Sequence, residues 1–463
     1  MILLEKSGRQ PLYRQLYEAI KESVLSGETT GRLDSILVCS SKLGISANTV
    51  NAAYQMLVSE GYLLSVPGSG YYVNPTIPQE KTVQALSDAV SSGHEPYVRY
   101  DFWNGNATPS LFPWPKWRKA YHNGLLAEQK MWESGSSSSR PAIRALQEAI
   151  AMTVNDHRGI QCSPDQIVLC FSPAHLFRIL LQLLPPETNK WGIEDPGYMP
   201  IRSSLVLHGY DLQPLSVAGE EAFLTSAEES GCNCFYVTPS HQYPTGSVLS
   251  PGARSRLLAL AEQRNGYILE DDYDCEFSYD KPPLASIAAS DQMGRVIYYG
   301  DLEKLLFPMG SLSFLILPPQ LMKAFLSVDI SSRLSIPPSS LFACADFMLS
   351  GEFDRYVHRV ILACRKRYMM LLRIAKEASN PRVRLHATGS GVHMLLTVRT
   401  DKSENELLAW LLENGIRMYS IKEHFFAAPD PDAHTGSVTL LLGFIHISPD
   451  DLAEGFRKFL SLV

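Results

Sequence analysis

The chain has 463 residues, of which 41 are Lys or Arg and 48 are Asp or Glu, so its formal net charge is −7. Apolar residues make up 45% and charged residues 19% of it, as in ordinary globular proteins, which excludes fibrous and wholly disordered chains. No apolar run is long enough to cross a bilayer, and the first ten residues carry three charges and no signal-peptide stretch. We therefore expect a cytoplasmic protein with about two to four domains and no membrane partner.

The cysteines give little sign of a metal site. There are eight, scattered along the chain, and only Cys232 and Cys234 stand close together. One Cys-x-Cys pair without a second pair is a weak zinc signal. The pattern indicates reduced, buried thiols and no bound metal.

Residues 1–75 have the pattern of a small helical module that ends in a hairpin. Apolar residues recur at spacings of three and four over 13–24, 35–43 and 47–60, as in amphipathic helices. Two short apolar stretches within 62–73 then flank a Pro-Gly-Ser-Gly turn, which is typical of a β-hairpin. Three helices followed by a hairpin form the layout of a winged helix-turn-helix.

The start of the third expected helix carries groups suited to nucleic acid. Ser46, Asn48 and Thr49 stand there, where backbone N–H groups and short polar side chains can bind a phosphate or a base edge. Glycines in the hairpin turn let the backbone approach DNA closely. The same pattern also fits a helical interaction domain that binds no nucleic acid.

Residues 10–73 resemble the winged-helix DNA-binding domain of GntR-type bacterial regulators. The resemblance rests on Gln10-Pro11-Leu12-Tyr13, Leu43-Gly44-Ile45-Ser46, Asn48-Thr49-Val50, Glu60-Gly61-Tyr62 and Pro67-Gly68-Ser69-Gly70. It implies a double-stranded DNA operator as partner. The DNA-binding residues that it implies are Arg14, Arg32, Ser35, Lys42, Ser46, Asn48, Thr49, Gly68, Ser69 and Gly70.

Two positions depart from that family's pattern. After the leucine that corresponds to Leu33 the family carries Pro-Ser-x-Arg, whereas residues 34–37 of this chain read Asp-Ser-Ile-Leu. After the turn serine, Ser46, the family carries an arginine, whereas this chain has Ala47. Residues 1–75 hold six basic and six acidic side chains, so the module is neutral and the net charge of −7 lies in the rest of the chain. Each missing phosphate contact weakens DNA binding, so we expect low affinity per module and a dependence on dimerisation.

The rest of the chain is larger and of another class. Residues 76–98 are rich in Pro, Ser and charge and indicate a linker, within which 83–90 can form a helix. From 99 to 463, helices alternate with short apolar strands, which predicts an α/β domain with a mostly parallel sheet and helices on both faces. The stretch from about Val383 predicts a small C-terminal α+β subdomain.

Four motifs follow predicted strands within 194–198, 236–246, 269–277 and 298–304, and α/β sheets bind ligands at such strand ends. Their residues suit pyridoxal phosphate. Lys304 can form a Schiff base with its aldehyde, and a buried carboxylate, Asp271, can hold its pyridine nitrogen protonated. Tyr273 can hydrogen-bond the ring hydroxyl and Tyr198 can stack on the ring. Taken singly, each of these residues also fits an ordinary surface or loop position.

These motifs resemble the fold-type I aminotransferase domain of MocR/GabR-type regulators, which follows a GntR-type winged helix. The resemblance covers essentially the whole chain and implies a transcriptional regulator that works as a domain-swapped homodimer without physiological turnover. Its second domain would sense a small-molecule effector (an amino acid, an amine or a B6 vitamer) through pyridoxal 5'-phosphate. The cofactor-binding residues that it implies are Lys304, Asp271, Tyr273, Tyr198 and His241.

The expected phosphate ligands are replaced. The family reads Gly-Thr-Phe-Ser-Lys with an arginine seven positions later, whereas this chain has Asp301 and Glu303 for the hydroxyls and Ser311 for the arginine. Two carboxylates beside a phosphate dianion repel it. Two alternatives therefore stay open: a catalytically active aminotransferase with an accessory domain, and a regulator that has lost cofactor binding.

Overall fold

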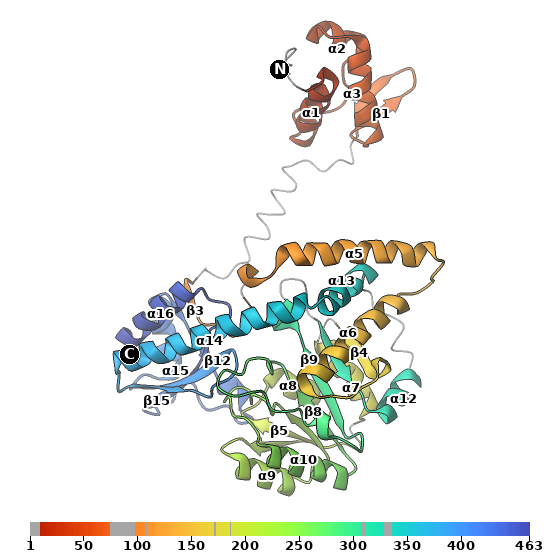
Figure 1. The fold of residues 1–463 in the computed structure, drawn as a ribbon. Coiled ribbons are helices and arrows are strands. Elements are labelled where there is room, and N and C mark those ends of the chain that lie inside the picture. The colour runs from red at the N-terminus through yellow and green to blue at the C-terminus, as the bar shows by residue number, and fades with distance from the viewer. Residues whose placement is uncertain are drawn as a thin grey trace. The chain divides into compact units, whose positions relative to one another are not determined.

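The computed structural model describes residues 10–74, 98–107, 109–170, 173–185, 187–306, 312–327 and 336–463, and within these it does not describe the side chains of 170, 173–176 and 178. The chain divides into two compact units, residues 1–97 and 98–463 (Figure 1). Apart from Val98, the linker expected over 76–98 lies outside the described residues, as does the helix expected at 83–90.

The smaller unit has three helices and a two-stranded antiparallel hairpin: α1 (Leu12–Leu25), α2 (Ile36–Leu43), α3 (Ala47–Ser59), β1 (Leu63–Val66) and β2 (Gly70–Val73). Its own apolar core includes Leu16, Val50 and Leu57, each fully buried. Gly44 ends α2 in the left-handed conformation that glycine adopts without strain. The winged helix predicted from the sequence is therefore confirmed.

The larger unit is built on a seven-stranded sheet in the order β4-β10-β9-β8-β7-β5-β6. The neighbours from β6 to β9 are parallel, whereas β10 is antiparallel to both β9 and β4. The predicted mostly parallel sheet is confirmed. The strands are β4 (Ile167–Cys170), β5 (Trp191–Asp195), β6 (Leu212–Ser216), β7 (Cys234–Val237), β8 (Tyr267–Asp271), β9 (Val296–Asp301) and β10 (Ser313–Ile316).

Alternate residues of these strands enter separate cores, because successive side chains of a strand point to opposite faces. On β9, Tyr298 joins one apolar cluster and Tyr299 another, and Phe314 and Leu315 divide in the same way. Helices provide the rest of both cores. Those of this layer are α5 (Trp114–Glu133), α6 (Arg140–Arg158), α7 (Pro173–Leu183), α8 (Met199–Leu207), α9 (Glu220–Glu229), α10 (Pro251–Gln263), α11 (Glu303–Leu306), α12 (Pro319–Ser327) and α13 (Pro338–Leu349).

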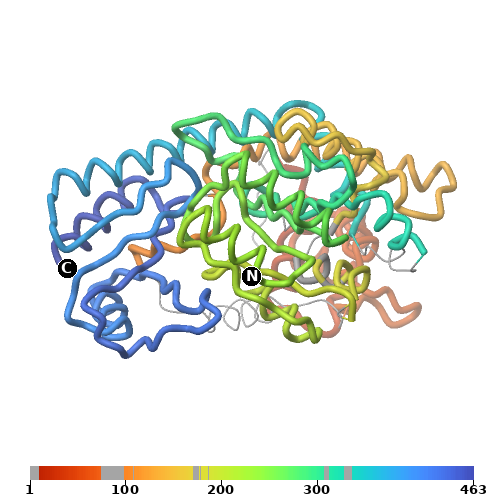
Figure 2. The backbone as a smooth tube through the Cα atoms, turned by 90° about the horizontal axis from the view of Figure 1, so that it is seen from below, coloured from red at the N-terminus to blue at the C-terminus, as the bar shows by residue number. Residues whose placement is uncertain are grey.

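A smaller antiparallel sheet of four strands, in the order β11-β12-β15-β14, follows the long helix α14 (Glu352–Ala378). Figures 1 and 2 show α14 running from the large sheet toward this C-terminal part, which is blue in both views. The predicted small α+β subdomain is present. Its elements are β11 (Val383–His386), β12 (His393–Arg399), α15 (Glu404–Glu413), β14 (Tyr419–Ser420), β15 (Ser437–Gly443) and α16 (Pro449–Leu462), beside the parallel pair β3 (Tyr100–Asp101) and β13 (Ile416–Arg417).

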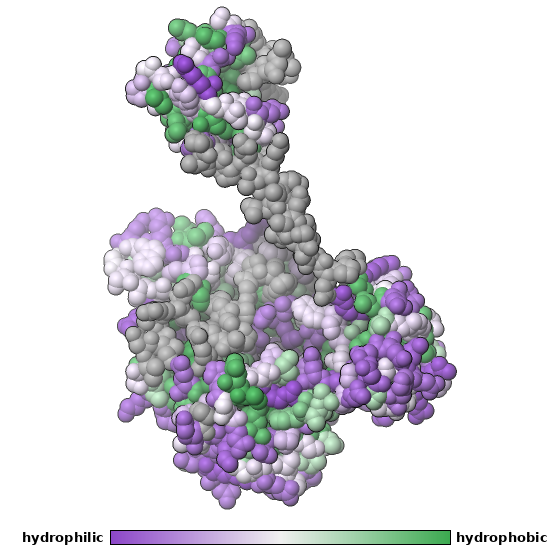
Figure 3. Space-filling view, turned by 180° about the vertical axis from the view of Figure 1, so that it is seen from behind, coloured by the Kyte–Doolittle hydropathy of each residue, from purple (hydrophilic) through white to green (hydrophobic). Residues whose placement is uncertain are grey.

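The surface is that of a chain with mixed polarity. On the face shown in Figure 3, hydrophobic residues occur in small groups among hydrophilic ones. Among the described helices, none is both long and apolar enough to cross a membrane.

Candidate functional site

Four of the five residues expected to bind a cofactor line one cavity of about 280 Å³ at the carboxyl ends of the parallel strands. Asp271 ends β8, Tyr198 and Tyr273 follow β5 and β8, and Lys304 lies in the short helix α11 that follows β9. The other lining residues are Trp103, Asn104, Gly105, Asn106, Tyr236, Thr238, Tyr243, Tyr299, Asp301 and Glu303. We call this space the Lys304 cavity.

Asp271 is a buried carboxyl that is only half satisfied. It accepts a 2.5 Å hydrogen bond from the Tyr236 hydroxyl, and its Oδ1 has no hydrogen-bond partner among the described residues. Burial raises the pKa of Asp271 well above its ordinary value, and the nearby Asp301 carboxylate adds to the rise. A buried acceptor of this kind calls for a donor, so Asp271 is placed to accept a proton or N–H from a ligand.

Lys304 lies in an environment with conflicting effects. Desolvation lowers the pKa of its ammonium group, while the carboxylates of Asp274, Asp301, Glu303 and Asp271 act in the opposite direction. Its Nζ is 5.7 Å from the centre of the Tyr273 ring. A lysine with a lowered pKa is more often unprotonated, which is the form that reacts with carbonyl groups.

His241, the fifth expected residue, does not line the Lys304 cavity. It lies behind Tyr273, whose hydroxyl is 3.0 Å from His241 Nδ1 and donates a hydrogen bond to the His241 carbonyl. The same Nδ1 is 2.8 Å from the Asp274 carboxylate. Direct cofactor contact, as expected from the sequence, stays a prediction for His241, whose contacts here are with Tyr273 and Asp274.

Pyridoxal phosphate fits one end of the cavity and not the other. The unpartnered oxygen of Asp271 and the rings of Tyr198 and Tyr273 suit a protonated pyridine ring. A phosphate dianion needs cations or hydroxyls around it. The same space instead contains the carboxylates of Asp301 and Glu303. Burial raises the pKa of Asp301 to about 6. These residues do not fit the phosphate group; Ser311 lies outside the described residues.

The lining also contains residues that the sequence did not single out. Tyr236, Thr238 and Tyr243 belong to the second motif, so their positions near the strand end could have been found from it. The segment 103–106 comes from the start of the larger unit, far from the motifs in sequence. No local pattern marks it, because only the folded chain brings it to the cavity.

Of the residues expected to bind DNA, seven lie at two helix starts or at the hairpin turn: Ser35, Ser46, Asn48, Thr49, Gly68, Ser69 and Gly70. Ser35 and Ser46 cap α2 and α3, accepting hydrogen bonds from the backbone N–H of Val38 and Thr49. Asn48 is exposed in the first turn of α3. The structure thus leaves Asn48 available to a ligand, while the two serines already hold the helices' first turns.

The hairpin turn depends on glycine. Gly68 and Gly70 have φ values of 74° and 115°, which favour glycine, and Ser69 Oγ is 2.7 Å from the Tyr72 hydroxyl. The guanidinium of Arg32 lies against Gly70, so that a Cβ there would come within 3.6 Å of it. Arg32 and the turn therefore occupy one surface.

Two of the expected phosphate-binding cations are paired with carboxylates. Lys42 Nζ is 2.8 Å from Asp34, and Arg14 Nε is 3.6 Å from Glu18. Both pairs are exposed, so each is weak and can open. Asp34 stands in the stretch where the GntR pattern has Pro-Ser-x-Arg, which explains why the module has little positive field.

Comparison with known proteins decides the family. Residues 12–73 match the family of bacterial regulatory proteins called the gntR family. The chain is 31% identical to the uncharacterized HTH-type transcriptional regulator YhdI of Bacillus subtilis over 98% of this chain and 96% of that one. It is 28% identical to the probable rhizopine catabolism regulatory protein MocR of Rhizobium meliloti, over 100% and 95%. The chain belongs to the MocR-type HTH transcriptional regulators.

The larger unit of this MocR-type regulator has the aminotransferase fold. It is similar to an archaeal alanine:glyoxylate aminotransferase, with a TM-score of 0.67, 19% identity and coverage of 83% of this chain and 94% of that one. It is also similar to the α-aminoadipate aminotransferase LysN of Thermus thermophilus, with a TM-score of 0.65, 21% identity and coverage of 82% and 100%. The fold-type I aminotransferase architecture predicted from the sequence is therefore confirmed.

Proposed function

We propose that this MocR-type regulator binds a double-stranded DNA operator as a homodimer and senses a small-molecule effector in the Lys304 cavity without turning it over. The observation that carries the effector site is the unpartnered, buried Oδ1 of Asp271 in the cavity that also holds Lys304. A domain-swapped dimer places two winged helices on one DNA molecule, which compensates for their neutral charge. Such a regulator acts in the cytoplasm, where the DNA is.

The effector that fits best carries a protonated nitrogen and no phosphate. A nitrogen cation satisfies Asp271, whereas a phosphate dianion about 4 Å from a carboxylate is repelled by about 8 kcal/mol at an effective dielectric constant near 20. An amine or an unphosphorylated B6 vitamer meets both conditions. Pyridoxal 5'-phosphate as a Schiff base on Lys304 is the family's expectation, and Asp301 and Glu303 oppose it.

The cavity lacks what a transaminase needs for its substrate. In the described part of the lining there is no arginine to hold a substrate carboxylate. Catalysis of transamination also requires a tightly oriented cofactor, which the carboxylates disfavour. Sensing is therefore better supported than turnover, and release of keto acid from a panel of amino acids and pyridoxal phosphate would favour the enzyme instead.

A cofactor titration tests the ligand assignment. We expect the parent protein to give little of the visible Schiff-base absorbance with pyridoxal phosphate, and the double variant Asp301→Thr/Glu303→Ser to bind it at least about tenfold more tightly. Lys304→Ala in the double variant is the matched control and should lack the band. A saturating band in the parent at low cofactor concentration would contradict the phosphate-free assignment.

The regulator assignment has a test of its own. In a mobility-shift assay with the DNA upstream of its own gene, the full chain should give a sequence-specific, salt-sensitive shift. Asn48→Ala should weaken that shift without changing the oligomeric state seen in sedimentation. A protein that binds no DNA specifically at any dimer concentration would overturn the proposal.

A further inference from the structure

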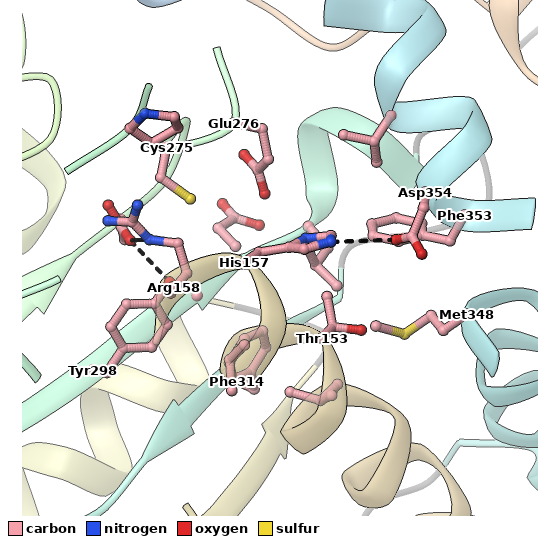
Figure 4. A pocket seen from close by; sticks show the side chains of 18 of the residues that line it. Thr153, His157, Arg158, Cys275, Glu276, Tyr298, Phe314, Met348, Phe353 and Asp354 are labelled. Carbon is pink, nitrogen blue, oxygen red and sulfur yellow. Dashed lines mark hydrogen bonds and ion pairs between the residues drawn. The ribbon is translucent and has the colours of Figure 1, made fainter. Parts of the chain in front are cut away.

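A second cavity, larger than the first, lies on the other side of the large sheet. Its volume is about 460 Å³, within the range of small-molecule sites. It opens between α6, α14 and the loop that follows β8 (Figure 4). We call it the Glu276 cavity. Its lining includes Ile150, Val154, Phe314, Phe353 and Val357, all buried and apolar.

One end of this apolar cavity is polar and acidic. Arg158 Nε and the Tyr298 hydroxyl donate hydrogen bonds of 2.7 and 2.9 Å to Asp272 Oδ2. Asp272 is 3% exposed, and its Oδ1 has no hydrogen-bond partner in the described part of the chain. Arg158 therefore balances the charge of Asp272 but leaves one acceptor unsatisfied.

Glu276 adds a second carboxylate at this end and has no cation of its own. No hydrogen bond or ion pair joins its side chain to another described residue, and it is partly exposed to the cavity. In Figure 4, Glu276 and Arg158 lie on one side, facing Met348 and Phe353 on the other. Burial raises the pKa of Glu276 to about 7, and Asp272 adds to the rise. A cation placed here would relieve both carboxylates.

The mouth of the cavity is polar and exposed. His157 Nε2 and Asp354 Oδ1 are 3.6 Å apart across it, from α6 and α14, and His358 lies one helical turn further along α14. An exposed rim above a buried apolar wall allows a ligand to enter from solvent. The wall would contact the body of the ligand, and the acidic end would contact its head.

The Glu276 cavity is distinct from the Lys304 cavity. Tyr298 of β9 lines the one and Tyr299 the other, because neighbouring residues of a strand face opposite sides of the sheet. Asp272, just after β8, and Asp271, its last residue, divide between the cavities in the same way. Among the described lining residues only Asp301 is shared. A ligand can therefore occupy one cavity while the other is empty.

We propose that the Glu276 cavity is a binding site for a hydrophobic primary amine, with the apolar body between α6 and α14 and the ammonium group against Glu276 and Asp272. The apolar wall selects the body by burial of its surface. The two carboxylates select the charged head, because charge-assisted hydrogen bonds in a partly buried site are stronger than neutral ones. The proposal does not depend on the effector assigned to the Lys304 cavity.

Binding of a matched pair of probes to the full-length protein tests the site. Calorimetry with 4-phenylbutylamine and with 4-phenylbutan-1-ol separates the contribution of the charge from that of the apolar body. We expect the amine to bind at least about tenfold more tightly than the alcohol to the parent protein. In Glu276→Gln this difference should disappear, and in Asp271→Asn, which changes only the other cavity, it should persist.

The outcomes separate the two cavities. Equal binding of amine and alcohol, no binding of either, or a preference that survives Glu276→Gln would overturn the proposal. Loss of the preference in Asp271→Asn would place the amine in the Lys304 cavity and overturn it as well. If Glu276→Gln does not fold, Thr153→Phe serves instead, because Thr153 of α6 lines the cavity: it should weaken both probes, and unchanged binding would overturn the site.

Discussion

Burial raises the pKa of the Asp271 carboxyl, and the direction of this shift determines how Asp271 changes the stability of the fold with pH. A carboxyl whose folded pKa exceeds its unfolded value stabilises the fold at low pH and loses that contribution as pH rises through the folded pKa, by at most about 1.4 kcal/mol per pH unit. Because asparagine does not ionise, we expect the Asp271→Asn variant not to lose stability in this way. Thermal unfolding of both proteins between pH 5 and 8 (about three pH units) should show that the stability of the variant relative to the parent increases as pH rises.

Other carboxyls with raised pKa also contribute to the pH profile of stability, so the difference between the two proteins is the informative quantity. Glu194 is such a group, since burial raises its pKa to about 7, and it is unchanged in both. A parent and a variant with parallel pH profiles would show that Asp271 is not the source of the pH dependence.

Glu276 should make amine binding in its cavity depend on pH. Because burial raises its pKa to about 7, the carboxylate that attracts an ammonium group forms only as pH rises through that value. We expect the affinity for 4-phenylbutylamine to increase between pH 6 and 8, by up to about tenfold per unit below the pKa. The other charged groups that face this space are Asp272, Arg158, Asp301, His157, Asp354 and His358. Glu276→Gln separates their effects, and a profile that stays equally steep in this variant would contradict the assignment.

Asp34 is the residue that most directly reduces the positive field of the winged helix. It pairs with Lys42 at 2.8 Å on the surface. Asp34→Ser should free Lys42 for a phosphate, raise DNA affinity and steepen its salt dependence by about one contact. A double-mutant cycle with Lys42→Ala checks the cause: in the Lys42→Ala background, Asp34→Ser should have little further effect.

At the scale of elements, the first turn of α3 is where stability and DNA binding meet. Ser46 Oγ accepts the hydrogen bond from the Thr49 N–H, at 3.1 Å. Ser46→Ala should destabilise the winged helix by about 1 kcal/mol and weaken DNA binding, because it removes the cap. Thermal unfolding and mobility shift measure the two effects. Ser59→Ala, at the other end of α3, is the matched control and should change DNA binding little.

The sequence pattern predicted the elements well where periodicity is local. Because their motifs both follow predicted strands, Asp271 and Lys304 were expected at one ligand site, and the structure does bring them to one cavity. Lys304 itself lies on the short helix α11 rather than at a strand end. His241 belongs to the second motif, yet it contacts Tyr273 and does not line the cavity, which the motif could not show.

The Glu276 cavity could not be predicted from sequence at all. Glu276 stands in one of the motifs, but the wall opposite it comes from α14, far along the chain. A motif reports residues that are close in sequence, whereas a cavity depends on the crossing of distant helices. The residues that replace phosphate ligands, in contrast, were visible from sequence because Asp301 and Glu303 adjoin Lys304.

At the scale of the molecule, the two units carry different charges and have separate cores. The winged helix packs around its own apolar cluster, and the aminotransferase-like unit has clusters of its own. The net charge of −7 belongs to the chain outside residues 1–75. Six basic and six acidic side chains in residues 1–75 leave the winged helix itself neutral. Each winged helix then has few cations for phosphate contacts, so we expect a second winged helix from the dimer partner to raise the affinity.

Dimerisation should therefore be visible in the salt dependence of DNA binding. Each cation that neutralises a phosphate contributes about −0.9 to the slope of log affinity against log salt. Because two winged helices bind together in a dimer, the full chain should show about twice the slope of residues 10–74 alone, together with a much higher affinity. Filter binding over a salt series measures both slopes. Equal slopes for the full chain and the isolated winged helix would mean that one winged helix binds DNA at a time. The proposal that the chain binds its operator as a dimer would then be wrong.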